Sequence, residues 1–333
     1  MYYECAVKRL ESNEIAVAAR PGEGLPKVQA GAVFLEVARS IVDARHLVDR
    51  ALASGQLERS WTHLDWCSLV GRVIQVGGGV DEVRLGDRVS AIGPVASRVV
   101  LPAQECLVVP DELDTDQAAY WALLVALVRQ ARQIRIEIGE SVLVLGGGLV
   151  GHLIAQLSVV AGAALVVGVD HGQRTDDRGA ESRLWGPVPT WVTHQGALER
   201  ELPQGKGDIL IDILGDFAQL ASILPMLRTG GRALLLATDS VHTVDFDLYP
   251  GIHRRSLKLT SGTLRAALRQ SSQGAIRSTG EVAFIRHLLR DDRLGLTHRT
   301  AMRVHPVHSD EKISPIDEVV NLIVQWENHD ETS

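Results

Sequence analysis

The sequence predicts an α/β protein in which a β-rich amino-terminal region precedes a doubly wound parallel sheet. Three observations lead to this prediction. Short runs of β-branched residues, separated by glycine turns, occupy about the first hundred residues. Strand and helix patterns then alternate, as they do in parallel sheets whose faces are covered by helices. Between these regions, a glycine-rich turn joins a short apolar run to an apolar helix at residues 139–160.

Length and composition restrict the class of protein. A chain of 333 residues is long for one domain and sufficient for two. Its 45% hydrophobic content predicts a soluble globular protein, and its formal net charge of −7 argues against a nucleic-acid partner. No apolar run reaches transmembrane length and no signal-peptide pattern opens the chain, so no membrane partner is expected. The widely spaced Cys5, Cys67 and Cys106 fit no disulfide or metal spacing, which predicts a reducing, cytoplasmic location.

The amino-terminal region is expected to consist of strands. The runs with strand character are Ala32–Val37, Val70–Val76, Ala96–Leu101 and Cys106–Val109. Residues 77–89 read as a glycine turn followed by the entry to another strand. The pattern becomes helical over Asp116–Arg132, where alanine, leucine and valine recur at three- and four-residue spacing. The parallel sheet is therefore expected to follow this helix directly.

The glycine-rich turn lies in a complete strand–turn–helix–strand unit. Val142–Leu145 is a short strand, Leu149–Val160 is an apolar helix, and Ala164–Val169 is a second buried strand. Asp170 ends that strand, nineteen residues after Gly151. This arrangement predicts a dinucleotide-binding unit, in which the pyrophosphate lies at the amino terminus of the helix. An ordinary βαβ unit with a glycine turn is the alternative.

Each glycine of the turn has a predicted role. Gly146 permits the tight turn, Gly148 lets the backbone approach the pyrophosphate, and Gly151 lets helix and strand pack closely. The residues expected to contact the cofactor are Gly146, Gly147, Gly148, Leu149, Val150, Gly151, Asp170, His171 and Arg174.

The acid at the end of the second strand predicts which cofactor binds. A carboxylate at Asp170 accepts hydrogen bonds from the adenosine ribose and repels a 2′-phosphate, which favours NAD(H) over NADP(H). His171 and Arg174 follow directly and can weaken this preference. Arg174 can instead lie over the adenine or in solvent, and NAD(H) is the expected cofactor.

Further strands and helices complete the predicted sheet. The expected strands are Asp208–Leu214, Ala233–Ala237 and Leu257–Ser261, with a helix over Phe217–Leu227 closed by Thr229-Gly-Gly. Two amphipathic helices are expected at Gly280–Arg290 and Ser314–Glu327. Trp185 and Trp191 are expected to cover a helix or loop surface.

The order of motifs resembles the medium-chain dehydrogenase/reductase superfamily. Its motifs are matched by Val70-Gly-Arg-Val-Ile-Gln-Val-Gly77, Val83-Arg-Leu-Gly-Asp-Arg-Val89, Pro94–Pro102 with Cys106–Pro110, the turn at Gly139–Gly151, and Arg228-Thr-Gly-Gly-Arg232. This resemblance covers nearly the whole chain. It implies a discontinuous GroES-like catalytic domain at residues 1–118 and 263–333, and a Rossmann domain at residues 119–262.

One segment is similar to a particular branch of that superfamily. Trp66-Cys-Ser-Leu-Val-Gly71 resembles the version found in relatives of bacteriochlorophyllide dehydrogenase, which lack the structural-zinc loop. The residues at the positions of the catalytic zinc ligands also differ from those of zinc-dependent members. Val42, Cys67 and the apolar segment Leu123–Val125 stand there, whereas catalytic zinc takes three protein ligands with N, S or O donors. The resemblance therefore implies an enzyme without zinc.

Without zinc, side chains must manage the proton of the reaction. The resemblance puts five candidate catalytic residues in the cleft: His46, Asp43, Tyr120, Cys67 and Ser68. His46 is the natural proton carrier near neutral pH, and it can equally be a surface histidine that opens a helix. Asp43 can be the N-cap of that helix, Tyr120 can pack between domains, and Cys67 can be a small buried apolar residue.

Histidines elsewhere suggest no metal. His298, His305 and His308 are expected in a solvated loop, because Pro306 separates the last two and no acid shares their face. His152 follows the glycine turn directly and is expected beside the pyrophosphate or against the first domain. It can contact phosphate without a catalytic role.

The resemblance and the departures from it together predict an activity. We expect a zinc-independent, NAD(H)-dependent oxidoreductase that interconverts a secondary alcohol and a ketone on a moderately large, mainly apolar substrate in specialised biosynthesis. One alternative is an enoyl- or quinone-type reductase of C=C bonds, although such members use NADPH and lack the acid at Asp170. Another is a redox-neutral cyclase, isomerase or binding protein that retains a dinucleotide.

The last strand of the parallel sheet predicts an assembly. Leu257–Ser261 is short and alternating and is expected at an edge of the sheet, where unpaired backbone groups invite a partner. In the superfamily this strand pairs with its copy across a twofold axis, which implies a homodimer. Leu257 and Leu259 are expected to bury apolar surface there, and Lys258 can instead guard against association.

Overall fold

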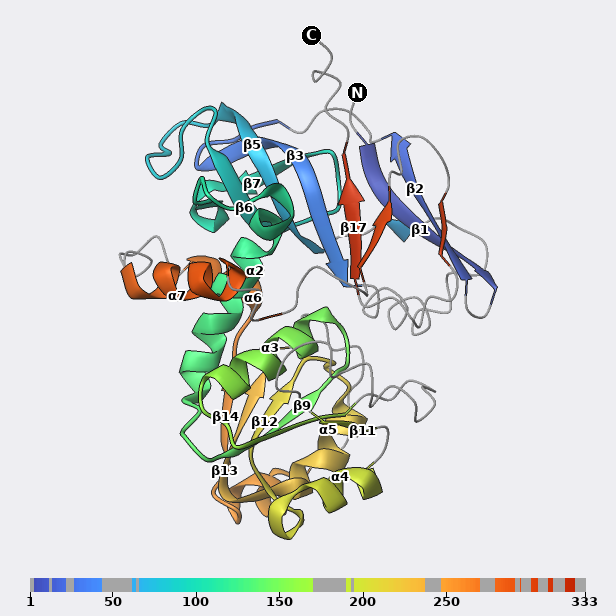
Figure 1. Ribbon diagram of the computed structural model, residues 1–333, viewed down its shortest axis with the longest axis vertical. Coiled ribbons are helices and arrows are strands. Elements are labelled where there is room, and N and C mark those ends of the chain that lie inside the picture. Colours follow the sequence, from blue (N-terminus) through green and yellow to red (C-terminus); the bar gives the residue numbers. More distant parts are fainter. Residues whose placement is uncertain are drawn as a thin grey trace. The chain divides into compact units, whose positions relative to one another are not determined.

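The computed structural model describes the chain in segments and divides it into two compact units. The described residues are 3–11, 14–21, 27–43, 62–63, 66–169, 190–192, 195–236, 247–269, 279–290, 294, 301–304, 311–313 and 321–326. The first unit comprises Met1–Val125, Leu268–Asp291 and Leu296–Ser333, and the second comprises Ala126–Ala267 and Asp292–Gly295 (Figure 1). Sheet topology confirms the expected fold class, because a mainly antiparallel unit accompanies a unit with a parallel sheet.

The second unit is built on six strands in the order β11-β10-β9-β12-β13-β14. These strands are β9 (Ser141–Leu145), β10 (Leu165–Val169), β11 (Thr190–Val192), β12 (Gly207–Asp212), β13 (Leu227–Leu235) and β14 (Lys258–Ser261). Every neighbouring pair is parallel. The chain runs outward from β9 to β11 and then returns to β12 on the other side of β9. The switch in direction between β9 and β12 is the place where open α/β sheets bind ligands, outside the carboxyl ends of the strands.

Apolar burial on both faces explains the composition of this sheet. All five residues of β9 are buried, as expected for a strand whose two faces are both covered. The helices of the unit include α3 (Leu149–Val160), α4 (Gln195–Glu201) and α5 (Phe217–Ile223). Leu143, Val167 and Leu210, from three adjacent strands, belong to one apolar core. The structure confirms the expected helix at Leu149–Val160 with the same bounds.

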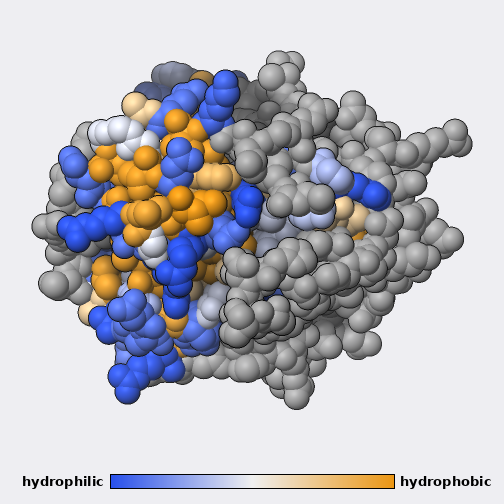
Figure 2. All heavy atoms as spheres, turned by 90° about the horizontal axis from the view of Figure 1, so that it is seen from above, coloured by the Kyte–Doolittle hydropathy of each residue, from blue (hydrophilic) through white to orange (hydrophobic). Residues whose placement is uncertain are grey.

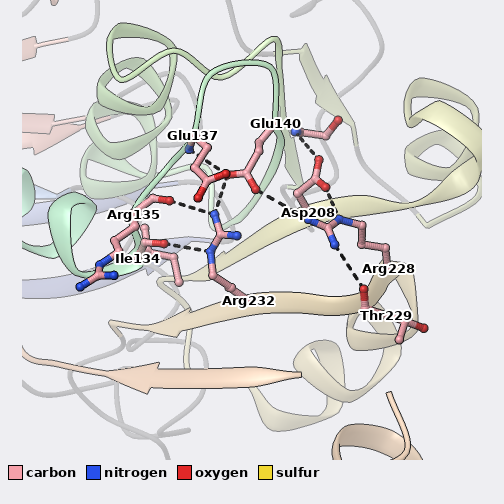
Figure 3. A network of polar contacts seen from close by, with 9 residues as sticks. Ile134, Arg135, Glu137, Glu140, Asp208, Arg228, Thr229 and Arg232 are labelled. Atoms are coloured by element: carbon pink, nitrogen blue, oxygen red, sulfur yellow. Dashed lines mark hydrogen bonds and ion pairs between the residues drawn. The ribbon is translucent and has the colours of Figure 1, made fainter. Parts of the chain in front are cut away.

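A polar network joins the amino ends of β9, β12 and β13 (Figure 3). Arg232 donates to Glu140 at 2.5 Å and to the Ile134 carbonyl at 3.0 Å. Arg228 forms an ion pair with Asp208, which also accepts a hydrogen bond from the Ser141 N–H at 2.8 Å. Most of the contacts in this network are charge-assisted hydrogen bonds, and they fasten three strands together at the end of the sheet opposite the glycine turn.

The first unit contains two sheets. The larger has the order β15-β17-β3-β5-β6-β8, with β7 also paired to β3, and the smaller has the order β16-β2-β1-β4. Strands of the larger sheet are β3 (Ala32–Asp43), β5 (Cys67–Val76), β6 (Arg88–Gly93), β7 (Arg98–Pro102), β8 (Leu107–Val108), β15 (Ala301–Val304) and β17 (Asn321–Gln325). Strands of the smaller sheet are β1 (Tyr3–Glu11), β2 (Glu14–Pro21), β4 (Thr62–His63) and β16 (Glu311–Ile313). The antiparallel pairing of β3 with β5 forms the centre of the larger sheet.

Further helices and short helical turns lie between the strands along the chain. The α-helices outside the parallel sheet are α2 (Thr115–Ile134), α6 (Leu264–Arg269) and α7 (Thr279–Arg290). The short helical turns are η1 (Ala103–Glu105), η4 (Pro203–Gly205), η5 (Leu224–Met226) and η6 (Tyr249–His253). Among the described helices, none combines the length and apolar character that a bilayer crossing needs.

The described part of the first unit exposes some large apolar side chains. On the face drawn in Figure 2, the apolar residues of the described part gather in one area, and hydrophilic residues surround them. The exposed large apolar side chains of this unit include Leu85, 69% exposed in the turn before β6, and Val108, 52% exposed in the two-residue strand β8.

Two expectations from the sequence are wrong. The helix expected at Ser314–Glu327 is replaced by β17, whose residues pair antiparallel with β3 and parallel with β15, while residues 314–320 lie outside the described part. The run Asn-Leu-Ile-Val-Gln suits a strand once β3 supplies a partner. The helix expected at Phe217–Leu227 ends at Ile223, because Leu227 already pairs with β12 as the first residue of β13. Thr229-Gly-Gly therefore lies within a strand.

Candidate functional site

The glycine turn begins directly where β9 ends. Gly146 has φ +116°, a backbone conformation that favours glycine, and its N–H donates to the Val169 carbonyl at 3.0 Å. A Cβ at this position would lie 3.3 Å from side-chain atoms of Ile213 and Leu214. The turn is therefore held between the ends of β10 and β12, and both its conformation and its surroundings require glycine.

The third glycine of the turn permits the closest backbone approach in this site. A Cβ on Gly151 would lie 1.8 Å from the Gly146 carbonyl oxygen, so the first turn of α3 rests directly on the glycine turn. Backbone contact of this kind allows no side chain. The predicted packing role of Gly151 therefore has a geometric basis in the structure.

The amino terminus of α3 has no side-chain cap. Gly148 is the N-cap, with φ −78° and ψ −172°, and offers no side-chain hydrogen bond to the first N–H groups of the helix. The first turn of α3 also carries no acidic residue. Backbone N–H groups and the helix dipole at such a terminus attract a phosphate. The glycine turn and α3 thus fit the pyrophosphate of a dinucleotide.

Asp212 lies at the carboxyl end of β12, in register with the last residue of β9. Its Oδ1 accepts hydrogen bonds from the N–H groups of Leu214 at 3.0 Å and Gly215 at 3.2 Å. Burial raises the pKa of Asp212 to about 6; the two hydrogen bonds oppose this effect, and the charge of Asp216 adds to it. A buried acid with a raised pKa therefore borders the glycine turn, as is common at functional sites.

The structure places part of the predicted cofactor set. Gly146, Gly147, Gly148, Leu149, Val150 and Gly151 form the turn and the start of α3. Leu149 and Val150 are buried, so they contribute backbone groups rather than exposed side chains. Asp170, His171 and Arg174 lie outside the described residues, and their roles remain predictions.

Two residues of this region were missed in the sequence. Trp191 lies in β11, packs over Gly168 and stacks on His152, which follows the glycine turn, with ring centroids 4.4 Å apart. The expectation that Trp191 covers a helix or loop surface is confirmed for α3, but it overlooked the strand on which Trp191 lies. The glycine within the apolar strand β10 was the available signal, since a glycine inside a strand often marks a close approach. The second missed residue is Asp212, and the Gly215 that follows it was the available signal.

The catalytic candidates of the first unit are buried where the structure describes them. Cys67 and Ser68 open β5, Asp43 ends β3, and Tyr120 lies in the first half of α2. Tyr120, Cys67 and Ser68 are fully buried and Asp43 is 4% exposed. The Ser68 hydroxyl donates to the Ala119 carbonyl at 2.5 Å, which ties β5 to the residue preceding Tyr120. His46 lies outside the described residues, as does the helix expected after it.

The Cys67 thiol is held in its neutral form. Burial raises the pKa of Cys67 to about 12, against the opposing effects of hydrogen bonds with Ser40 and the Gly93 backbone. Its Sγ donates to the Pro94 carbonyl at 3.6 Å. Ser40 also accepts a hydrogen bond from the Trp326 indole at 3.1 Å. A protonated thiol is a poor nucleophile, because the thiolate is the attacking form.

The positions that match zinc ligands do not fit a zinc ion. Val42 is 1% exposed and apolar, and Leu123–Val125 is a buried apolar segment, so Cys67 is the one possible donor at these three positions. Zinc needs three N, S or O donors from the protein at a catalytic site. Within the described ranges, no group of three or more His, Cys, Asp or Glu side chains is arranged to hold a metal.

Sequence comparison relates the chain to dehydrogenases and reductases. No protein-family model matches the chain. It is 27% identical over 199 residues to the D-guloside 3-dehydrogenase of Escherichia coli K12, covering 57% of this chain and 56% of that protein. It is 31% identical over 144 residues to the "Probable D-xylulose reductase A" of Neosartorya fischeri, covering 42% and 40% of the two chains. The chain thus spans about half the length of the curated relatives it matches.

Solved structures share the fold over almost the whole chain. The alcohol dehydrogenase TADH of Thermus sp. ATN1 superposes with a TM-score of 0.68 at 17% identity, covering 98% of this chain and all of that one. A short chain alcohol dehydrogenase of E. coli CFT073 complexed with NADH superposes with a TM-score of 0.63 at 14% identity, covering 98% of this chain and 99% of that one. A "putative zinc-binding dehydrogenase" of Sinorhizobium meliloti 1021 bound to NADP superposes with a TM-score of 0.63 at 17% identity, covering 97% of this chain and 99% of that one. The chain therefore shares the fold of these dehydrogenases.

Proposed function

We propose that this chain is a dinucleotide-dependent oxidoreductase that interconverts an alcohol and a ketone. The observation that carries the proposal is the approach of Gly151 to the Gly146 carbonyl, which seats the uncapped end of α3 against the end of β9. Further support comes from the names of the relatives, each a dehydrogenase or a reductase. The fold alone would not carry it, because one fold serves many functions.

The residues of the second unit have specific roles in this proposal. Backbone N–H groups at the start of α3 bind the pyrophosphate, Gly148 lets the backbone approach it, and Gly146 and Gly151 let the turn pack against α3. Asp170 selects the adenosine ribose of NAD(H). The bound nicotinamide supplies the acceptor or donor of the hydride. Solved structures with this fold hold NADH in one case and NADP in another, so the cofactor preference depends on Asp170 and not on the fold.

Cofactor titration tests this proposal. NADH fluorescence is expected to change on saturable binding, and NADPH is expected to bind about tenfold or more weakly, because its 2′-phosphate meets the Asp170 carboxylate. An Asp170→Asn variant should reduce this difference. Equal or tighter binding of NADPH to the native chain would overturn the NAD(H) preference. Failure of both cofactors to bind would overturn the whole proposal.

We further propose that the reaction needs no zinc. Support comes from apolar Val42 and from the apolar segment Leu123–Val125, which stand where zinc-dependent members of the family that the chain resembles have ligands. His46, Asp43, Tyr120 and Ser68 are the candidates for handling the proton in its place. The purified chain is expected to hold much less than one zinc per chain by metal analysis, and turnover should survive a chelator. Stoichiometric zinc whose removal abolishes turnover would contradict this.

The substrate class has two candidates. The sequence favours a moderately large, mainly apolar secondary alcohol. The relatives named for D-guloside and D-xylulose favour a polyhydroxylated substrate instead. A panel of secondary alcohols from both classes, assayed by NADH formation, distinguishes them by kcat/KM. NADPH-dependent loss of an enone chromophore, without oxidation of any alcohol, would favour reduction of a C=C bond.

We also propose a homodimer through β14. This strand ends the order of the six-stranded sheet, and Leu259 on it is 42% exposed whereas the preceding Leu257 is buried. Light scattering at micromolar concentration is expected to give about twice the chain mass of 36.1 kDa. Leu259→Pro should produce monomers that still bind cofactor, because proline cannot donate to a strand pair. A native chain that elutes as a monomer would rule out the dimer.

A further inference from the structure

Two aromatic rings stack beside the glycine turn. The imidazole of His152, on the first turn of α3, faces the indole of Trp191 on β11, with centroids 4.4 Å apart and ring planes at 20°. Both residues are only partly buried. The stack joins two elements that are separated in the sequence by about forty residues, and it lies within the second unit. A contact of this kind restricts where the imidazole can go.

Trp191 occupies a space that glycines leave open. It is the register partner of Gly168 on β10, and a Cβ there would lie 2.2 Å from the indole ring. A Cβ on Gly151 would lie 3.6 Å from the far edge of the same ring. The indole therefore packs on the strand beside β9 and also reaches the third glycine of the turn. Its position is fixed by backbone on two sides, so it forms a rigid surface for His152.

His152 in turn holds one peptide of the glycine turn. Its Nδ1 lies 2.9 Å from the Gly148 carbonyl, which also accepts the His152 backbone N–H at 3.0 Å. The Nδ1–H tautomer donates this bond. Because the peptide unit is planar and trans, fixing the Gly148 carbonyl also fixes the direction of the Leu149 N–H, which points the opposite way. That N–H belongs to the first residue of α3, where an anion would bind.

We propose that His152 and Trp191 are positioning residues for the pyrophosphate of the bound dinucleotide. Trp191 holds the imidazole by stacking, and the imidazole holds the Gly148–Leu149 peptide with its N–H directed outward from the helix. The pair lowers the cost of ordering the turn when the anion binds. This inference rests on the proposed function, since it concerns the same glycine turn.

The test compares ligands with and without a pyrophosphate. His152→Leu is expected to weaken ADP-ribose binding about threefold to tenfold, the size expected for one lost hydrogen bond, and to leave the binding of adenosine unchanged. His152→Asn is the matched control, because its amide nitrogen can take the place of Nδ1 and should restore affinity. His152→Gln places its amide nitrogen nearer the position of Nε2 and should behave like the leucine variant. Calorimetry measures all four proteins.

Trp191 is tested on the same ligands. Trp191→Ala removes the stacked surface and should weaken ADP-ribose binding about as much as His152→Leu, while Trp191→Phe should keep most of the affinity. The double variant His152→Leu/Trp191→Ala should be no weaker than either single variant, because the two residues act through one contact.

The outcomes separate this inference from the proposed function. A native chain that binds neither ADP-ribose nor NADH overturns the proposed function. A native chain that binds them, together with a folded His152→Leu that binds ADP-ribose equally well, overturns the positioning role alone. Equal losses for ADP-ribose and adenosine would also overturn it, since they would indicate general disruption of the fold. Should the leucine variant fail to fold, the comparison of His152→Gln with His152→Asn decides the same question.

Discussion

Asp208 and Asp212 lie four residues apart on β12, yet the structure treats them in opposite ways. Asp208, at the amino end, pairs with Arg228 and accepts the Ser141 N–H. Asp212, at the carboxyl end, is buried and accepts only backbone N–H groups among its described hydrogen bonds. The structure therefore stabilises the charged form of Asp208 and destabilises the charged form of Asp212, although both are aspartates on the same strand.

Their pKa values differ in direction for physical reasons. Burial alone would raise the pKa of Asp208, but the hydrogen bonds from Ser141 and Arg228 and the charges of Arg228 and Arg232 outweigh it and lower the pKa. At Asp212 burial prevails and raises the pKa to about 6. The amino end has partners that stabilise the fold. The carboxyl end has the glycine turn and the uncapped start of α3, whose backbone N–H groups can bind a ligand.

Among these predictions, the largest effect on binding and stability is expected from a substitution at the carboxyl ends of the parallel strands. Gly151→Ala forces a methyl group to within 1.8 Å of the Gly146 oxygen, so α3 must move away from β9. Dinucleotide binding, measured by calorimetry, should fall below detection, and the free energy of unfolding should drop by about 3 kcal/mol. Gly78→Ala is the control, because a Cβ there meets nothing within 4 Å. Normal binding by Gly151→Ala would show that the turn is not the site.

At the amino ends of the parallel strands, replacement of Glu140 is expected to cause the largest loss of stability. Its carboxylate is nearly buried and accepts from Arg232 and from the Glu137 N–H. Glu140→Ala leaves the Arg232 guanidinium without this partner and should lower the free energy of unfolding by about 3 kcal/mol in urea denaturation. Glu140→Gln keeps the acceptor and should lose less. Dinucleotide affinity of the folded variant should be unchanged, and a parallel loss of affinity would contradict the separation of the two ends.

Asp212→Asn should stabilise the protein, and more so at higher pH. Because the folded pKa of about 6 exceeds the unfolded value of about 3.9, Asp212 costs stability as pH rises through this window. The amide keeps the acceptor for Leu214 and Gly215 without the charge. Its advantage in the free energy of unfolding is expected to grow by about 1 kcal/mol between pH 5 and pH 7.5. An advantage that is independent of pH would mean that Asp212 is not the titrating group.

Asp208→Asn should have the smallest effect and the opposite sign. The lowered pKa of Asp208 means that its charged form stabilises the fold above its unfolded pKa, and this contribution disappears as pH falls through the folded value. Since Arg228 is about half exposed, the variant should lose only about 1 kcal/mol at pH 7. The loss should shrink at pH 4 in the same urea measurement. If the stability lost by Asp208→Asn grew as the pH fell, the charged form of Asp208 would not be the stabilising one, and the contrast with Asp212 would be wrong.

Local patterns accounted for most of the second unit. The helix Leu149–Val160, the strands on either side of it and the glycine turn were all predictable, because periodicity and backbone conformation act within about thirty residues. The edge position of β14 followed from strand order. The helix expected over Ser314–Glu327 failed because β3 and β15 supply strand partners that no local pattern shows.

The sequence by itself determined the fold class and the glycine turn, because Gly146 and Gly151 are needed wherever the chain makes that turn. Only the tertiary structure decided the surroundings of single side chains. It placed Trp191 over Gly168, buried Asp212 with no counter-charge among the described residues, and directed the Cys67 thiol to the Pro94 carbonyl. Such surroundings combine segments far apart in the chain, and the free energy of a charge or a ring depends on all of them at once.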